Sequence, residues 1–155
     1  MGLVQDDTGN DLTYRIIGAA MKVHNDLGPG YKEEIYERAL ASQLNQDGIG
    51  AKTQVPIEVW HSGSLVGLFY LDIFVEEQVV VEIKAFSHQL TNDELAQMIN
   101  YLKASCAPVG LLFNFGRRKL QFRRVFPSKD DSPVRRIGRD NVKKAELPDV
   151  NFGDE

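Results

Sequence analysis

Residues 67–85 read GLFYLDIFVEEQVVVEIKA, two strongly apolar runs joined by Glu76-Glu77-Gln78. Runs rich in β-branched and aromatic residues on either side of a short polar link predict two antiparallel strands. We expect the strands at Leu65–Val75 and Val79–Ala85. Further along the chain, the continuous apolar run Val109–Phe115 is typical of a strand buried on both faces.

Three charged residues, Asp72, Glu82 and Lys84, interrupt these apolar runs. Strand side chains alternate, so Glu82 and Lys84 should share one face of the second strand. If the turn pivots on Glu77, Asp72 lies opposite Glu82, with Cβ atoms about 4.5–5.5 Å apart. An even-numbered turn without a bulge would instead place the two carboxylates on opposite faces.

The rest of the chain predicts helices before and after this hairpin. Apolar residues recur at helical spacing in two segments before it, and Thr91 with Glu94 forms a capping box after it. The expected elements are helices over 12–27, 31–46 and Asn92–Ser105, and strands over Lys52–Trp60, Leu65–Val75, Val79–Ala85, Val109–Phe115 and around Phe122. The order α-α-β-β-β-α-β-β predicts an α/β fold, a mixed β-sheet flanked by helices.

Composition sets the class of protein. The 155 residues are 43% hydrophobic, enough for one domain, expected at 10–126, followed by an extension over 127–155. No apolar run approaches the ~20 residues that span a bilayer, and residues 1–7 do not resemble a signal peptide, so we expect a cytoplasmic protein. The single Cys106 and three histidines argue against a structural zinc site.

Charge is distributed unevenly along the chain. Residues 117–144 hold eleven of the eighteen Lys and Arg but only three of the twenty-two Asp and Glu. A basic segment on an acidic body fits a polyanionic partner such as nucleic acid. A solvated face with no ligand explains the same charges, and the sequence leaves both interpretations open.

The interrupted hairpin also predicts chemistry. Two carboxylates and a backbone carbonyl form a donor set that suits Mg²⁺ or Mn²⁺. A lysine two residues further on can orient a water molecule or neutralise charge on a phosphate. The simpler alternative is a solvent ion pair between Glu82 and Lys84 at a sheet edge. Their position inside apolar strands favours a functional site.

Several motifs, in order along the chain, resemble those of the GxxExxY proteins, a family grouped with the PD-(D/E)xK nuclease superfamily. The family pattern Gly-x-x-Glu-x-x-Tyr is met by Gly30-Tyr-Lys-Glu33-Glu-Ile-Tyr36. The other matching segments are His24–Gly30, Gln54-Val-Pro-Ile57, Asp72, Glu82-Ile-Lys84, Gln97-Met-Ile-Asn-Tyr-Leu102 and Gly110–Gly116. The resemblance covers about residues 12–126.

The resemblance implies a mixed sheet between helices and a site built on the hairpin. The acidic pair and the lysine map onto Asp72, Glu82 and Lys84, although Leu71 rather than proline precedes the aspartate. The helix glutamate maps onto Glu33. The other implied residues are Ile83, whose carbonyl would join Asp72, Glu82 and Glu33 around Mg²⁺ or Mn²⁺, and Gln97 and Tyr101, which resemble a Gln-x-x-x-Tyr element that holds DNA and the site.

The implied activity is a metal-dependent nuclease, with DNA as the expected substrate. The residues expected to hold the phosphate backbone are Arg117, Arg118, Lys119, Arg123 and Arg124. The alternative is a catalytically silent nucleic-acid-binding or accessory module with a protein partner or as a homodimer. Retention of Asp72, Glu82 and Lys84 together favours catalysis, because a binding module needs none of them.

Two further residues are interpreted as structural. Tyr36 is expected in the core or beside Glu33. His24 is expected to pack near the end of the first helix.

Overall fold

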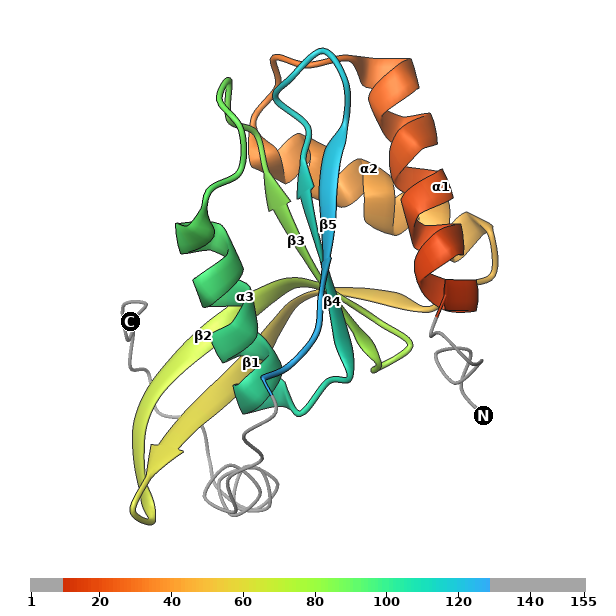
Figure 1. The fold of residues 1–155 in the computed structure, drawn as a ribbon. Helices are drawn as coiled ribbons and strands as arrows, with labels where there is room; N and C mark the ends of the chain where they lie inside the picture. The colour runs from red at the N-terminus through yellow and green to blue at the C-terminus, as the bar shows by residue number, and fades with distance from the viewer. Residues whose placement is uncertain (1–9, 129–155) are drawn as a thin grey trace.

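A five-stranded mixed sheet forms the centre of the molecule, with strand order β1-β2-β3-β4-β5 (Figure 1). The structure is a computed structural model that describes residues 10–128. Its elements are α1 (Asn10–Leu27), α2 (Glu33–Gln46), β1 (Ala51–His61), β2 (Ser64–Val75), β3 (Val79–Lys84), α3 (Asn92–Ser105), β4 (Val109–Asn114) and β5 (Gln121–Val125). The predicted class and element order are confirmed. The predicted extension over 127–155 lies outside the described residues except for its first two.

The sheet is mixed because one of its connections is a helix. β1, β2 and β3 follow one another as antiparallel neighbours, whereas β3 and β4 run parallel. A parallel pair needs a crossover, and α3 supplies it. β5 returns antiparallel to β4 at the other edge. Helices α1 and α2 cover one face of the sheet, and α3 covers the other (Figure 1).

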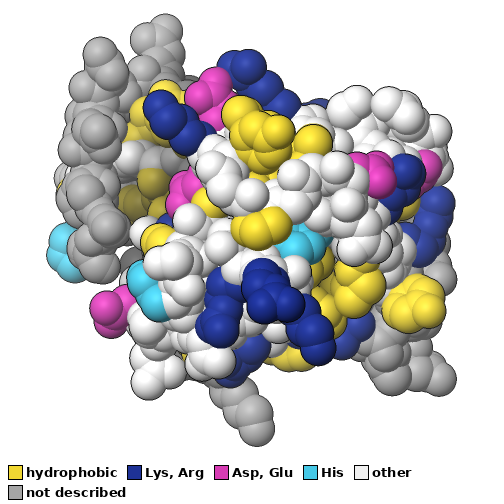
Figure 2. Space-filling model, turned by 90° about the horizontal axis from the view of Figure 1, so that it is seen from above, with side chains coloured by type: hydrophobic (Ala, Val, Ile, Leu, Met, Phe, Trp, Pro, Cys, Tyr) yellow, Lys and Arg dark blue, Asp and Glu magenta, His cyan; other side chains and the backbone are white. Residues whose placement is uncertain are grey.

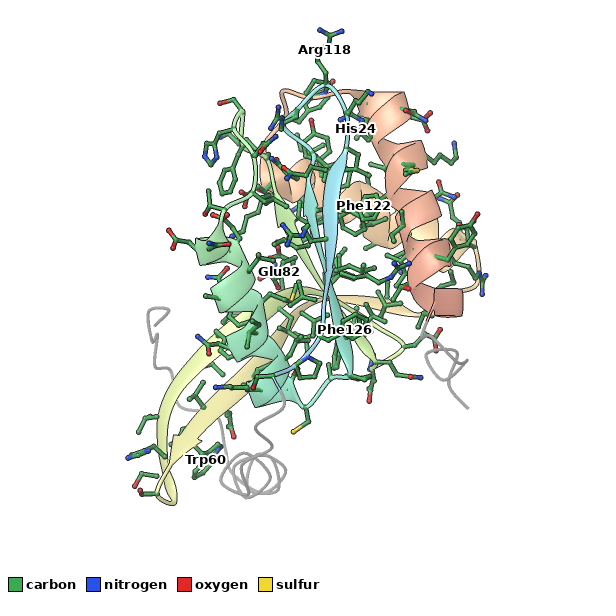
Figure 3. The ribbon with its side chains drawn as sticks, viewed as in Figure 1. His24, Trp60, Glu82, Arg118, Phe122 and Phe126 are labelled. Atoms are coloured by element: carbon green, nitrogen blue, oxygen red, sulfur yellow. The ribbon has the colours of Figure 1, made fainter. Side chains whose placement is uncertain are left out.

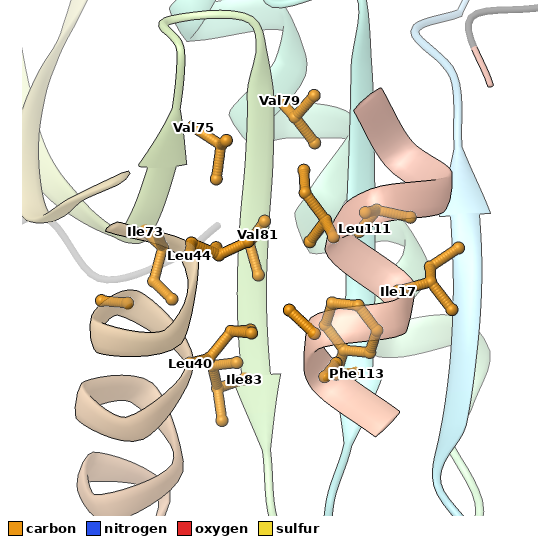
Figure 4. Packing of buried hydrophobic residues seen from close by; sticks show 14 of the residues in the cluster. Ile17, Leu40, Leu44, Ile73, Val75, Val79, Val81, Ile83, Leu111 and Phe113 are labelled. Atoms are coloured by element: carbon orange, nitrogen blue, oxygen red, sulfur yellow. The ribbon is translucent and has the colours of Figure 1, made fainter. Parts of the chain in front are cut away.

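Two hydrophobic clusters follow from this layering. In the first, side chains of α1 and α2 such as Ile17 and Leu40 pack on Val81 of β3 and Phe113 of β4 (Figure 4). In the second, α3 packs Met98 and its neighbours on the opposite side of the same strands. β4 is therefore buried along its whole length, which its uninterrupted apolar sequence predicted.

The hairpin between β2 and β3 has the predicted three-residue turn. Its register pairs Ile73 with Val81 and Val75 with Val79. The turn residues Glu76 and Glu77 have positive φ angles of 52° and 55°. The register confirms that Asp72 and Glu82 occupy opposed positions at the next step of the hairpin.

Tyr36 fixes the link between α1 and α2. Its side chain is fully buried and stacks on Phe115, with ring centroids 4.7 Å apart. Its hydroxyl donates to the carbonyl of Gly28 (2.5 Å) and accepts from the backbone N–H of Tyr31 (3.1 Å). The interpretation of Tyr36 as a core residue is confirmed. The stacking and hydrogen bonds hold the entry to α2, and with it the first turn of that helix.

Within residues 10–128, none of the helices combines the length and apolarity needed to cross a membrane.

Candidate active site

Asp72 and Glu82 lie where the central hairpin divides. The pairing of β2 with β3 ends at the pair Ile73–Val81. From Asp72 toward its own N-terminus, β2 pairs with β1 alone. At the division each carboxylate bonds the backbone of the opposite strand. The N–H of Asp72 donates to Glu82 Oε2 (3.1 Å), and the N–H of Ile83 donates to Asp72 Oδ2 (2.8 Å). Side chains thus satisfy two backbone donors that ladder partners no longer reach.

The surroundings of this pair favour protons on its carboxyl groups. Glu82 is 5% exposed, and its burial raises its pKa well above the usual range, with the negative charge of Asp72 adding to the effect. Burial also raises the pKa of Asp72, against the lowering effects of the Ile83 N–H and of Glu82. Two carboxyl groups this close keep one proton between them unless a cation takes its place.

The donor set of the pair fits a hard divalent cation. Asp72 and Glu82 offer carboxylate oxygens, and the β3 backbone beside them offers carbonyls, the ligands that Mg²⁺ and Mn²⁺ prefer. A bound cation would replace the proton that the pair otherwise retains. No group of three or more His, Cys, Asp and Glu arranged to hold a metal occurs among the described residues. Backbone and water would therefore complete any coordination shell.

Lys84 stands on the same face of β3 as Glu82, as strand alternation predicted. Its Nζ donates to Oε1 of Gln97 on α3 (3.4 Å). Its positive charge also lowers the pKa values of both Asp72 and Glu82. The structure thus brings four predicted residues together from three elements: Asp72, Glu82, Lys84 and Gln97.

Helix α2 carries Glu33 and Glu37 one turn apart near its start. Glu33, the predicted member, is exposed in the first turn. Glu37 lies one turn further and is half-buried. Both of its carboxylate oxygens accept from Nε2 of Gln54 on β1 (3.1 and 3.0 Å). Burial raises the pKa of Glu37, the hydrogen bond from Gln54 lowers it, and the negative charge of Asp72 raises it.

The family of the chain follows from comparison with known proteins. A model of the PD-(D/E)XK nuclease superfamily matches residues 10–125, most of the chain. The chain belongs to the PD-(D/E)XK nuclease superfamily. The finer resemblance to GxxExxY proteins remains a prediction within it. A comparison with curated proteins found no match.

Solved structures share the fold of this superfamily member. Similar chains include the crystal structure of SSO0001, with a TM-score of 0.53 and 20% sequence identity. The match covers 71% of the present chain and 57% of that one, so this chain spans little more than half of its structural relative. At this identity the likeness concerns the fold alone.

Basic side chains of this PD-(D/E)XK domain gather on the loop between β4 and β5. Arg117, Arg118 and Lys119 line a cleft of about 670 Å³ together with Ser87 and Gln89 of the β3–α3 loop. Seen from this end, Lys and Arg side chains form one patch with histidine beside it (Figure 2). Arg118 projects from the tip of the loop, whereas Glu82 lies deeper, beside α3 (Figure 3). The patch and the acidic pair are separate features.

A buried amide holds the two loops of this cleft together. Asn114, which is fully buried, donates to the carbonyl of His88 (2.8 Å) and accepts from the N–H groups of Phe86 (2.8 Å) and Gly116 (3.1 Å). His24 packs beside Phe115 as predicted, and its Nε2 donates to the carbonyl of Arg117 (2.8 Å). The cleft is thus lined by loops of fixed backbone.

The remaining predicted residues lie elsewhere. Arg123 and Arg124 are exposed on the edge strand β5, and Arg124 donates through Nε to Thr13 on α1 (3.1 Å). Tyr101 stacks on Phe69 of β2, with centroids 4.3 Å apart. Arg124 therefore contacts α1, and Tyr101 packs against the β1–β2 hairpin.

Sequence reasoning missed Glu37 and Gln54. Glu37 lies four residues after Glu33, so both occupy one stripe of the helix, and that spacing was the available signal. Gln54 stands in a matching motif, but nothing in its sequence context indicates the positive φ that it adopts.

Proposed function

We propose that this protein is a nuclease that uses Mg²⁺ or Mn²⁺ to hydrolyse phosphodiester bonds, with DNA as its substrate. The main support is the opposed pair of half-buried Asp72 and buried Glu82, with Lys84 on the same face of β3 as Glu82. Superfamily membership supports the same reaction class. A cytoplasmic location remains a prediction.

The residues have separate roles in this proposal. Asp72, Glu82 and the carbonyl of Ile83 would hold the cation, and Glu33 would contribute an outer carboxylate. The cation would stabilise the negative charge that develops on the scissile phosphate. Lys84, oriented by Gln97, would position the water whose oxygen forms the new bond to phosphorus as the bond to the leaving oxygen breaks.

The substrate backbone would be held outside the reacting centre. Arg117, Arg118 and Lys119 line the cleft at the same end of the sheet as Lys84, the last residue of β3. Arg and Lys neutralise phosphates without distinguishing bases, so this loop would bind without strong sequence preference. Arg123, Arg124 and Tyr101 would extend the contact along the protein surface.

A binding module without catalysis is the second candidate. The basic cleft is separate from the acidic pair, so it has no need of Asp72 or Glu82 to bind a polyanion. This candidate predicts binding to nucleic acid that weakens with salt, and no hydrolysis.

A cleavage assay separates the two candidates. Linear duplex, closed circular and single-stranded DNA, and one RNA, would be incubated with Mg²⁺ or Mn²⁺ and the full chain. Glu82→Gln keeps the shape of the buried side chain and removes its charge. Glu77→Gln makes the same change at an exposed turn residue whose ion pair with Lys52 is at the surface.

Cutting that requires the cation, is lost in Glu82→Gln and is kept in Glu77→Gln supports the nuclease. Cutting that survives in Glu82→Gln contradicts it and indicates another site or a contaminant. Binding without cutting favours the second candidate.

A further inference from the structure

Two stacked rings stand on the β3–α3 loop. The imidazole of His88 stacks on the ring of Phe86, with centroids 4.5 Å apart and ring planes at 15° to each other. His88 is exposed, whereas Phe86 is half-buried and packs against the cluster under α3. Because Phe86 covers one face of the imidazole, the exposed surface of His88 comes from its other face and its edges. Such a ring face is a surface on which another planar group can stack.

Hydrogen bonds hold His88 in this position. Its Nδ1 donates to the carbonyl of Gln89 (2.9 Å), and its own carbonyl accepts from Nδ2 of the buried Asn114 (2.8 Å). The N–H of Phe86 donates to Oδ1 of the same amide (2.8 Å). Both stacked residues are therefore tied to β4 through one side chain. A ring that is already oriented loses little conformational freedom when a ligand binds to it.

The basic loop between β4 and β5 lies directly against this stack. A Cβ on Gly116 would collide with the carbonyl of Phe86, so the two loop backbones are in close contact there. The next three residues are the basic ones of the cleft, Arg117, Arg118 and Lys119, and the opposite wall is formed by the two chain neighbours of His88. Lys and Arg side chains gather at this end with histidine beside them (Figure 2). Cations and an open ring face thus border one cleft.

Single-stranded DNA offers both groups that this surface would bind. Its phosphates carry the negative charge that Arg and Lys neutralise, and its unpaired bases present open π faces that stack on aromatic or histidine rings. In a duplex the same faces are covered by neighbouring base pairs, and exposing one costs the energy of unpairing and unstacking. Duplex DNA would therefore use the basic loop without the ring.

We propose that His88, stacked on Phe86, is a base-binding platform that makes single-stranded DNA the preferred ligand of the cleft. This inference rests on the proposed function, because it takes DNA to be the substrate. One base lies on the open face of His88, and the adjoining phosphates lie against the basic loop. The β3–α3 loop begins directly after Lys84, so a nucleotide held there lies at the end of β3 that carries this lysine.

The test compares the affinity of the full chain for single-stranded and duplex DNA by fluorescence anisotropy, in a chelator so that no cleavage intervenes. The probe is a short labelled dT oligonucleotide. Relaxed closed circular DNA, which has no ends, competes with it as the duplex. His88→Ala and His88→Gln remove the ring, and His88→Tyr restores one. His61→Ala is the matched control, an exposed histidine that follows Trp60 at the end of the molecule opposite Arg118 (Figure 3).

We expect His88→Ala and His88→Gln to weaken binding of the dT oligonucleotide about 5- to 100-fold, the usual effect of removing a ring on which one base stacks. The preference for single strand over circular duplex should fall by the same factor. His88→Tyr should bind the oligonucleotide at least as tightly as the unsubstituted protein does. Tyrosine and glutamine are both uncharged, so this contrast separates stacking from charge. His61→Ala should change neither affinity.

The outcomes separate this inference from the proposed function. Full affinity of His88→Ala for the oligonucleotide overturns the inference and leaves the proposed function standing, because cutting depends on Glu82 and not on this ring. Equal losses in His88→Ala and His88→Tyr, or equal losses for single strand and duplex, also overturn it. Binding that requires the ring in a protein that cuts no DNA supports the platform and contradicts the nuclease. A protein that binds no nucleic acid overturns both.

Discussion

At the scale of single residues, Glu82 determines what the site can bind. A carboxyl group buried beside another carboxyl either keeps a proton or binds a cation. The backbone N–H of Asp72 holds the Glu82 carboxyl in place, and the N–H of Ile83 holds that of Asp72. Proton and cation therefore compete for the same place. Two predictions follow from this competition.

The first concerns stability without divalent cations. The folded chain holds the Glu82 proton more tightly than the unfolded chain, whose group titrates near its ordinary pKa of 4.5. The group therefore contributes its full stability below that pH and loses it as pH rises through the folded pKa. Gln at this position has no proton to lose. Glu82→Gln should exceed the unsubstituted protein by about 1–3 kcal/mol at neutral pH, with the difference shrinking toward acid pH.

Urea unfolding in the presence of a chelator, across that pH range, measures this difference. An equal difference at every pH would show that Glu82 does not titrate differently in the two states.

The second concerns the cation itself. Because binding must expel the shared proton, Mn²⁺ affinity should rise with pH, by up to about tenfold per unit where one proton is released. Titration calorimetry in two buffers of different ionisation enthalpy counts that proton. Glu82→Gln should bind weakly and show no such release, and a pH-independent affinity in the unsubstituted protein would contradict the shared proton.

The opposition of Asp72 and Glu82 could be predicted from the sequence because an odd-numbered turn fixes the parity of a hairpin. The contact between Gln54 and Glu37 could not, because it depends on the left-handed step at Gln54, which no propensity for strand or turn encodes. Glu33 and Glu37 lie one turn apart on α2, and only the packing of α2 on the sheet shows that Glu37 is the half-buried one.

At the scale of elements, the entry to α2 depends on one hydroxyl. Tyr36→Phe keeps the ring stacked on Phe115 but leaves the Gly28 carbonyl and the Tyr31 N–H without their partner. We expect a loss of about 1–3 kcal/mol in the free energy of unfolding. Tyr14→Phe, the same change at a side chain that is 73% exposed on α1, should cost almost nothing. Equal effects of the two changes would remove the hydroxyl from this role.

The β3–α3 and β4–β5 loops can approach each other closely because residue 116 is a glycine. A Cβ on Gly116 would collide with the backbone of Ala85 and Phe86, so Gly116→Ala should destabilise the protein by about 1–3 kcal/mol. Gly18→Ala on α1 meets open space and should instead stabilise it by about 0.5–1 kcal/mol. Thermal unfolding of both variants checks the contrast, and a neutral Gly116→Ala would show that the loops can separate freely.

The elements themselves were predictable where periodicity was strong. The capping box of Thr91 and Glu94 marked the start of α3, and the unbroken apolar run of β4 indicated a strand buried on both faces. The start of α2 was less predictable, since Lys32 caps it without a side-chain hydrogen bond. The bond from Asn114 to the β3–α3 loop had no local signal, because its partners lie 26 and 28 residues away.

At the scale of the whole molecule, an acidic protein carries a basic loop at one end. Nucleic acid should therefore bind in one orientation, with the cleft of Arg118 toward the phosphates. In a chelator, Arg118→Ala should weaken binding to duplex DNA and lower the slope of log affinity against log salt by about 0.9, the loss of one phosphate contact. Lys22→Ala, a lysine paired with Asp26 on α1, should change neither. Fluorescence anisotropy over a salt series gives both numbers, and equal slopes in the two variants would place the contact elsewhere.

The point where β2 and β3 separate offers a way to detect cation binding from backbone hydrogen exchange. Two backbone amides at that division, those of Asp72 and Ile83, are protected from solvent by carboxylates and not by a neighbouring strand. Their hydrogen exchange therefore depends on the charge and position of those carboxylates, whereas exchange along the paired part of the hairpin depends on opening of the sheet. An ion that fixed both carboxylates would slow exchange at these two amides and leave Ile73 and Val81 unchanged, so occupancy of the site could be read from the backbone alone.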